Sequence, residues 1–248
     1  MTYRVLDLFS GIGGFSLGLE RTGGFKTVAF CEIDPFCRRV LAKHWPEVPC
    51  YDDVRTLTAE RLAADGIGVD VICGGFPCQD ISSAGKGAGL AGERSGLWSE
   101  ITRLIGEIRP SYVIVENVAA LLFRGMGAVL GDLAGLRYDA EWRNIPASAI
   151  GAPHQRERVW IVAYPHKGVR SPNVLLRCKP DKDVYQGFKR VRALQRAGSN
   201  GHRPPCNFTR IRPDDGISPR LDEIAALGNA VVPQIPEMIG RAILEANP

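Results

Sequence analysis

Residues 4–20 decide the fold class, and they read RVLDLFSGIGGFSLGLE. The apolar run at 4–9 is typical of a buried strand and has Asp7 near its end. The chain then enters a glycine-rich turn that opens an amphipathic helix reaching about Glu20. Glycines let the backbone approach a ligand, and a helix N-terminus offers free amide donors. This order predicts the first βα unit of a doubly wound, mostly parallel α/β sheet.

Acidic residues recur at the ends of the next expected strands. A second strand is expected over 27–31 and ends at Glu32, and a third strand edge at 51–54 contains Asp53. An acidic residue about 20 positions after such glycines commonly holds ribose hydroxyls. With Asp7, these carboxylates suit a nucleoside that carries hydroxyls, an amino group and a positive charge. They suit a diphosphate poorly, and the glycine spacing departs from the dinucleotide fingerprint.

The hydrophobic pattern continues as alternating strands and helices. Pro35 begins the next helix, as expected for a proline in the first turn. Helices are expected over 35–43, 95–108, 125–134 and 235–246, with a short one from 218, and strands over 69–73, 112–115, 138–145 and 159–163.

Residues 74–82 read GGFPCQDIS and follow the apolar run at 69–73. Two glycines end that strand, and Pro77 stiffens the approach to Cys78. Beyond it the chain turns polar and glycine-rich, which is typical of a loop. A cysteine placed in this way is suited to nucleophilic chemistry, while a structural thiol is an equally good interpretation of this segment alone.

Glu116 directly follows the expected strand at 112–115, which places it on the same edge of the sheet as Cys78. On its own, such a carboxylate is more often a helix cap or part of a loop ion pair. Arg156 and Arg158 alternate, so they point to one face if the following strand extends through them. Two guanidinium groups on one face can hold a carboxylate or a phosphate, whereas a solvated charged strand is the alternative.

Composition indicates a soluble globular protein. The 248 residues are 45% hydrophobic and 23% charged, and no apolar run approaches the roughly 18 residues of a membrane helix. No signal peptide is visible, and the seven cysteines show no paired spacing. We therefore expect reduced thiols, a cytoplasmic location and no metal site, since Cys178, His202 and Cys206 lack a fourth ligand.

The segment at 165–213 is strongly basic. It contains twelve Lys and Arg against two Asp and Glu, which leaves −6 for the rest of a chain of net charge +4. A basic block within an acidic body indicates a polyanionic partner, most simply nucleic acid, although a solvated loop is the commoner reason for a run of charge.

Taken together, the motifs resemble those of cytosine-C5 DNA methyltransferases. The resemblance is carried, in the order of that family and over nearly the whole chain, by residues 7–14, 32–34, 74–79, 116–118, 154–158 and 228–233. It implies a Rossmann-like S-adenosylmethionine-dependent methyltransferase fold. The implied domains are a catalytic domain at 1–164, a small inserted target recognition module at 165–216, and a C-terminal segment at 217–248 that returns to the catalytic domain.

The resemblance implies a site for S-adenosylmethionine, with S-adenosylhomocysteine as the product. In it, Glu32 holds the ribose hydroxyls, Ile33 packs on adenine and Asp53 binds the adenine amino group. The implied cofactor residues are Asp7, Phe9, Gly11, Gly13, Gly14, Glu32, Ile33, Asp53, Val54, Pro77, Leu97, Asn229 and Val231.

The resemblance also implies catalytic residues. Cys78 is the implied nucleophile and Glu116 the contact to N3 and the amino group of the target cytosine. Arg156 and Arg158 support the active site. The residues implied to contact DNA or the base are Gln79, Ser82 and Asn117. A thiolate that adds to C6 makes C5 nucleophilic toward a sulfonium methyl group, and the cytosine must first be flipped out of the duplex.

The implied activity is DNA (cytosine-5-)-methyltransferase on double-stranded DNA, in restriction–modification or phage DNA protection. We expect a monomer, with a cognate restriction endonuclease as a candidate partner. An RNA (tRNA) cytosine-C5 methyltransferase on the same framework is the main alternative. A catalytically silent DNA-binding relative and a nicotinamide oxidoreductase are weaker ones. Two departures stand out: His154 replaces the usual Gln, and the basic block is short.

Overall fold

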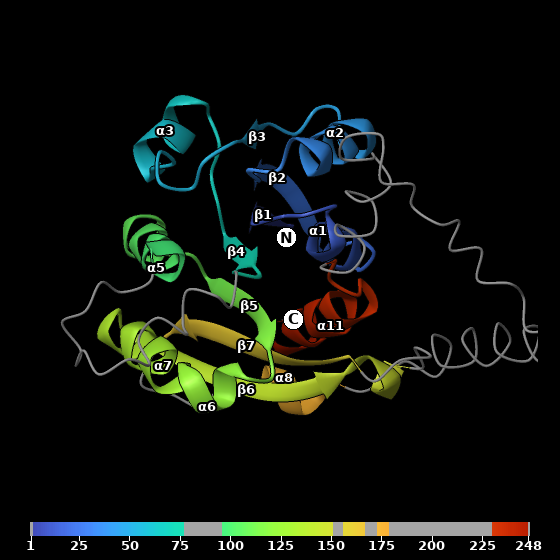
Figure 1. The fold of residues 1–248 in the computed structure, drawn as a ribbon, viewed down its shortest axis with the longest axis vertical. Helices are drawn as coiled ribbons and strands as arrows, with labels where there is room; N and C mark the ends of the chain where they lie inside the picture. The colour runs from blue at the N-terminus through green and yellow to red at the C-terminus, as the bar shows by residue number, and fades with distance from the viewer. Residues whose placement is uncertain (1, 77–95, 151–155, 167–172, 179–229, 248) are drawn as a thin grey trace, which may run out of the picture.

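The computed structural model describes residues 2–76, 96–150, 156–166, 173–178 and 230–247, and every structural statement below concerns these residues. A seven-stranded sheet forms the centre of the molecule, in the order β3-β2-β1-β4-β5-β7-β6 (Figure 1). The first five strands in this order run parallel, while β7 is antiparallel to both β5 and β6. The predicted doubly wound, mostly parallel sheet is confirmed.

The strands are β1 (Tyr3–Leu8), β2 (Phe25–Cys31), β3 (Cys50–Tyr51), β4 (Val71–Gly74), β5 (Tyr112–Val118), β6 (Tyr138–Pro146) and β7 (Glu157–Pro165). The helices are α1 (Gly14–Glu20), α2 (Pro35–His44), α3 (Ala59–Ala64), α5 (Gly96–Ile108), α6 (Leu121–Arg124), α7 (Met126–Gly135), α8 (Val174–Arg177) and α11 (Gln234–Ala246), with a 3-10 turn at Ala147–Ile150.

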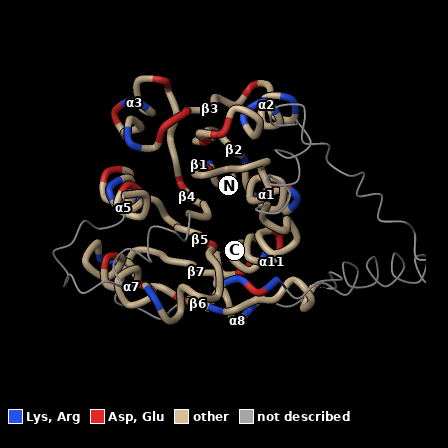
Figure 2. Tube along the Cα trace, viewed as in Figure 1, with Lys and Arg blue, Asp and Glu red and all other residues tan. Residues whose placement is uncertain are grey.

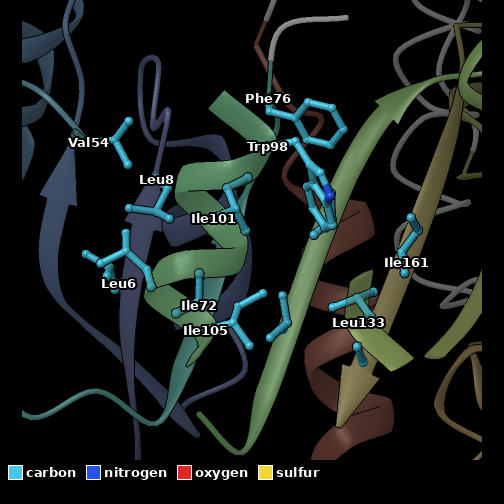
Figure 3. Close-up of a cluster of buried hydrophobic side chains, with 14 of the residues drawn as sticks. Leu6, Leu8, Val54, Ile72, Phe76, Trp98, Ile101, Ile105, Leu133 and Ile161 are labelled. Carbon is cyan, nitrogen blue, oxygen red and sulfur yellow. The ribbon is translucent and has the colours of Figure 1, made fainter. Parts of the chain in front are cut away.

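Helices cover both faces of the sheet and bury a separate core on each side. Helices α5 and α7 lie on one face, where Leu6, Ile72 and Ile105 are among the buried residues drawn in Figure 3. Helices α1 and α11 lie side by side on the other face, where Phe15 stacks edge-on against Trp160 (Figure 1). Burial on two faces explains why the central strands read as continuous apolar runs.

Most of the predicted elements are confirmed, with small shifts at their ends, but the third strand is shorter than expected. Instead of extending over 51–54, β3 ends at Tyr51. The chain turns immediately afterwards, because the backbone carbonyl of Asp53 accepts a hydrogen bond from the backbone N–H of Thr56. The sequence patterns also missed α3, a helix of six residues that is capped by the Thr58 side chain.

The described part of the basic block is small, and it packs against the sheet. The buried residues Val174 and Leu175 of α8 belong to the same core as α11. Their backbone N–H groups donate to the Glu141 carboxylate on β6. The rest of the predicted recognition module, and the short helix expected from 218, lie outside the described residues. The domain boundaries stay a prediction.

Helices α3 and α5 carry charged residues of both signs, whereas the charged residues of α2 are all basic (Figure 2). Within the described ranges, every helix is too short or too polar to cross a membrane.

Candidate active site

A pocket of about 600 Å³ opens where β1, β2, β4 and β5 end. Ligands of open α/β sheets bind at this carboxyl edge. Because β7 runs antiparallel to β5, its beginning reaches the same edge and brings two arginines there. The residues predicted from the sequence that line the pocket are Phe9, Gly11, Glu32, Ile33, Asp53, Val54, Leu97, Glu116, Asn117, Arg156 and Arg158.

The glycine-rich turn after β1 is shaped by steric necessity. Gly13 caps α1 with a φ of 84°, and a Cβ there would lie 2.6 Å from the Trp45 ring. At Gly14, a Cβ would lie 2.4 Å from the Val231 carbonyl oxygen, in the segment that leads into α11. Phe9 also has a positive φ, 52°, which is unusual for an aromatic residue and is found mainly at functional sites. Gly13 and Gly14 therefore allow the turn to pack closely against Trp45 and Val231.

Glu32, at the end of β2, links this turn to the neighbouring strand. Its Oε2 accepts the backbone N–H of Gly11 at 2.7 Å, and its Oε1 accepts that of Asp34 at 2.8 Å. The residue is only 9% exposed, yet it lines the pocket. Each carboxylate oxygen can accept a second hydrogen bond, so Glu32 can receive two hydroxyl groups from a ligand without losing its backbone contacts.

Next to Glu32 the pocket wall is apolar and open. Ile33 is 68% exposed, an unusual fraction for a large aliphatic side chain, and Val54 is buried beside the pocket. Asp53 lies at this end, where its carboxylate is held by Arg55 with Nη2 to Oδ2 at 2.7 Å and Nε to Oδ1 at 2.9 Å. The hydrogen bonds from Arg55 lower the pKa of Asp53. Sequence reasoning missed Arg55, whose only signal was its position two residues after Asp53.

At the other end of the pocket, Glu116 forms an ion pair with an arginine. Its Oε1 lies 2.8 Å from Nε of Arg158, and the residue is 9% exposed. Burial raises the pKa of Glu116, against the lowering effect of Arg158 and Arg156. Burial and the charge of Arg158 lower the pKa of Arg156, whose buried Nε has no hydrogen-bond partner among the described residues. This end of the pocket therefore holds two useful groups. The Glu116 carboxylate can take up a proton, and the Arg156 guanidinium has an Nε–H donor that is not used.

Two further residues fix the approach to Glu116. A Cβ at Gly75, directly after β4, would lie 2.9 Å from Glu116 Oε2, so any larger residue there would push the Glu116 carboxylate aside. Asn117 donates from Nδ2 to the Phe76 carbonyl oxygen at 3.0 Å and accepts the Val118 backbone N–H at 2.8 Å. Asn117 thereby links β5 to the segment that leads toward residue 78. Its predicted contact with DNA stays a prediction.

Asp7, another predicted cofactor residue, does not line the pocket. It is fully buried beneath α1, and its Oδ2 accepts the Ser16 hydroxyl at 2.7 Å. Burial raises the pKa of Asp7 to about 7, although the hydrogen bonds from Ser16 lower it. The predicted residues that lie outside the described part of the chain are Pro77, Cys78, Gln79, Ser82 and Asn229.

Comparison with known proteins decides the family. The profile of the C-5 cytosine-specific DNA methylases matches residues 3–197. The chain belongs to this family. Type II methyltransferase M2.BsuMI of Bacillus subtilis is 37% identical over 168 residues, which cover 64% of this chain and 41% of that protein. Type II methyltransferase M1.ScrFI of Lactococcus lactis is 34% identical over 171 residues, which cover 67% of this chain and 43% of the relative.

A solved structure supports the same assignment. A candidate DNA modification methyltransferase encoded within an Escherichia coli prophage superposes with a TM-score of 0.59 at 29% identity, over 73% of this chain and 51% of that one. The matches thus span less than half the length of these two curated relatives.

The residues present fit S-adenosylmethionine, the methyl donor that the family implies. Glu32 has free acceptor capacity for ribose hydroxyls, and the exposed face of Ile33 can cover an aromatic ring. The carboxylates of Glu32 and Asp34 beside the pocket suit a ligand without phosphate groups, which they would repel.

Proposed function

We propose that this chain is a DNA (cytosine-5-)-methyltransferase that uses S-adenosylmethionine. The observation that carries the proposal is a single pocket with two chemically different ends. One end combines Glu32 with the open apolar face of Ile33, and the other combines Glu116 with Arg158. The first suits a nucleoside-like cofactor and the second a base with a ring nitrogen and an amino group.

At the cofactor end, the residues bind the cofactor and orient it. Glu32 accepts the ribose hydroxyls while the N–H groups of Gly11 and Asp34 hold its carboxylate in place. Ile33 packs on the adenine. Bound S-adenosylmethionine supplies the methyl group.

At the base end, Glu116 donates a proton toward N3 of cytosine and accepts a hydrogen bond from the amino group. A raised pKa favours this role, since a neutral carboxyl can donate where a carboxylate cannot. Arg158 holds Glu116 in position, and the unused Nε of Arg156 can donate to the base. Charge that develops at N3 when C6 is attacked is thereby stabilised.

Cys78 is the proposed nucleophile. Its thiolate forms a bond to C6, which gives C5 the electron density to take the methyl group. A base then removes the C5 proton, the C5–C6 double bond re-forms, and the thiolate leaves. The base must be flipped out of the duplex at a cost of roughly a few kcal/mol. The basic block supplies positive charge for DNA.

We propose modification of double-stranded DNA as the biological role, because the curated relatives are Type II methyltransferases. A cognate restriction endonuclease or phage DNA protection, a monomeric state and a cytoplasmic location complete the proposal.

The decisive test is covalent trapping. Duplex DNA of random sequence containing 5-fluorocytosine is incubated with S-adenosylmethionine and either the parent protein, Cys78→Ala or Cys50→Ala. Fluorine at C5 cannot leave as a proton does, so the enzyme stays attached. We expect a denaturation-resistant adduct with the parent and with Cys50→Ala, and none with Cys78→Ala. An adduct only with 5-fluorocytidine RNA would assign the activity to RNA, and no adduct with either acceptor would refute the proposed chemistry.

A further inference from the structure

The two carboxylates at the cofactor end use their acceptor capacity differently. Glu32 accepts one backbone N–H at each oxygen, which leaves each oxygen able to accept another bond. Asp53 accepts the backbone N–H and Nε of Arg55 at Oδ1, and Nε and Nη2 of Arg55 at Oδ2. The four distances lie between 2.7 and 3.1 Å. Three N–H groups of one residue therefore occupy both oxygens of Asp53, with the Nε–H shared between them.

The Nε–H and Nη2–H donors belong to a side chain that can move, while the third donor is the backbone N–H of Arg55. The Arg55 side chain is 65% exposed and that of Asp53 is 26% exposed, and both residues line the pocket. The donors to Glu32, in contrast, belong to backbone that is fixed by the glycine turn and the start of α2. A ligand cannot displace those, but it can displace a guanidinium that solvent already reaches.

Asp53 is the predicted acceptor for the adenine amino group at this end of the pocket, beside the apolar side chains of Ile33 and Val54. The Asp53 carboxylate provides that acceptor only after Arg55 releases it. Nη2 and Nε would then exchange their carboxylate contact for water.

We propose that Arg55 is a competitive latch on Asp53, which weakens adenine binding in the free protein and must open when the cofactor enters. The inference rests on the proposed function, because it assumes an adenine nucleoside in this pocket. Substitution of an ordinary binding residue weakens the binding of the cofactor, whereas removal of the Arg55 side chain tightens it. The expected gain is about two- to fivefold, the worth of a solvent-exposed ion pair.

The test measures dissociation constants by calorimetry for the parent, Arg55→Ala and Arg241→Ala. Arg241 forms an exposed ion pair with Glu237 on α11, so its variant loses the same charge away from the pocket. The probe is S-adenosylhomocysteine, which lacks the sulfonium charge and so removes a general charge effect. S-inosylhomocysteine is the second probe, because its purine carries an oxygen in place of the amino group. Thermal melting checks that each variant is folded.

We expect Arg55→Ala to bind S-adenosylhomocysteine about two- to fivefold more tightly than the parent. Its affinity for S-inosylhomocysteine should stay unchanged or fall, and Arg241→Ala should match the parent with both probes. In an Asp53→Ala background, removing Arg55 should have no effect.

Weaker or unchanged binding of S-adenosylhomocysteine by Arg55→Ala would overturn the latch, as would equal tightening for both probes. These outcomes leave the proposed function intact. If the parent and all variants fail to bind S-adenosylhomocysteine, the cofactor assignment itself is wrong.

Discussion

Glu32 and Glu116, at opposite ends of the pocket, are held by different means. On the β1–β2 side, Glu32 is held by backbone N–H groups. On the β5–β7 side, Glu116 is held by the side chain of Arg158. Backbone donors are fixed once the sheet and the glycine turn have formed, so the first end is preorganised by the fold. Side-chain donors carry full charge and oppose the desolvation of the carboxylate, so the second end balances burial against ion pairing.

This difference predicts where each end is sensitive. Changes to the end that contains Glu32, the backbone-held end, should alter cofactor affinity and stability, with little effect on the chemical step. Changes to the end that contains Glu116 and Arg158, the ion-paired end, should alter the chemical step and its pH dependence, with little effect on cofactor affinity. The variants below test that separation.

The largest effect is expected for Glu116→Gln. The amide can still donate to N3 but cannot transfer a proton, so kcat should fall by about 10²- to 10³-fold. The dissociation constant of S-adenosylhomocysteine should change less than about twofold, because an uncharged side chain of equal size leaves the cofactor end unaltered. The parent rate should fall as pH rises above the raised pKa of Glu116, and the variant should lack that decline. Single-turnover methylation from pH 5 to 9 measures both. Loss of cofactor binding would show that the two ends are not separable.

Asp7 lies on β1 beneath the helix that follows the glycine turn, so its effect on stability tests the part of the fold that supports the backbone-held end. Its pKa is about 7 in the folded protein and close to 3.8 when unfolded, so the native state binds the extra proton between these values. The contribution of Asp7 to stability is therefore fully present below about pH 4 and is lost as pH rises to 7, at ~1.4 kcal/mol per pKa unit. Asp7→Asn keeps an acceptor for Ser16 and does not ionise. The free energy of unfolding of the parent should therefore fall between pH 4 and 7 by several kcal/mol more than that of the variant. Urea titrations with identical pH slopes for both proteins would contradict this.

Much of the fold could be predicted because its signals are local. The strand, glycine turn and helix at 4–20 follow from apolar runs and from glycines with positive φ. What the sequence could not supply were contacts between distant segments. The antiparallel pairing of β7 with β5, which brings Arg158 to Glu116, is set by the packing of the whole sheet. The close approach of Gly75 to Glu116 is likewise a contact with a side chain of another strand.

The candidate site shows the same limit. Glu32 and Glu116 could be identified because each follows an apolar run in the sequence. Asp7 has the same pattern but lies on the buried face beneath α1, since its side chain points to the side opposite to that of Leu6 and Leu8. Position at a strand end therefore predicts proximity to the pocket, and the face of the strand decides whether the side chain reaches it.

A moderate effect is expected for Glu32→Gln. The amide nitrogen of glutamine must face the backbone N–H of either Gly11 or Asp34, so one fixed donor loses its acceptor. The KM for S-adenosylmethionine should rise by roughly 10- to 100-fold, in line with the loss of one to two charge-assisted hydrogen bonds. At saturating cofactor, kcat should stay close to the parent value. Glu60→Gln, on the exposed first turn of α3, is the matched control and should leave both constants unchanged. A fall in kcat alone would place Glu32 in the chemistry instead.

The smallest effect concerns the shape of the glycine turn, which the backbone-held end requires. Gly14→Ala would bring a Cβ to 2.4 Å from the Val231 carbonyl oxygen, so the segment before α11 must shift. We expect a loss of about 1–3 kcal/mol in the free energy of unfolding, the usual cost of overpacking. Gly131→Ala is the matched control: it lies in the exposed interior of α7 with open space around its Cβ, and should gain about 0.5–1 kcal/mol. Urea unfolding of the two variants measures the contrast. Equal changes in the free energy of unfolding for the two variants would contradict the close contact between the glycine turn and the segment before α11.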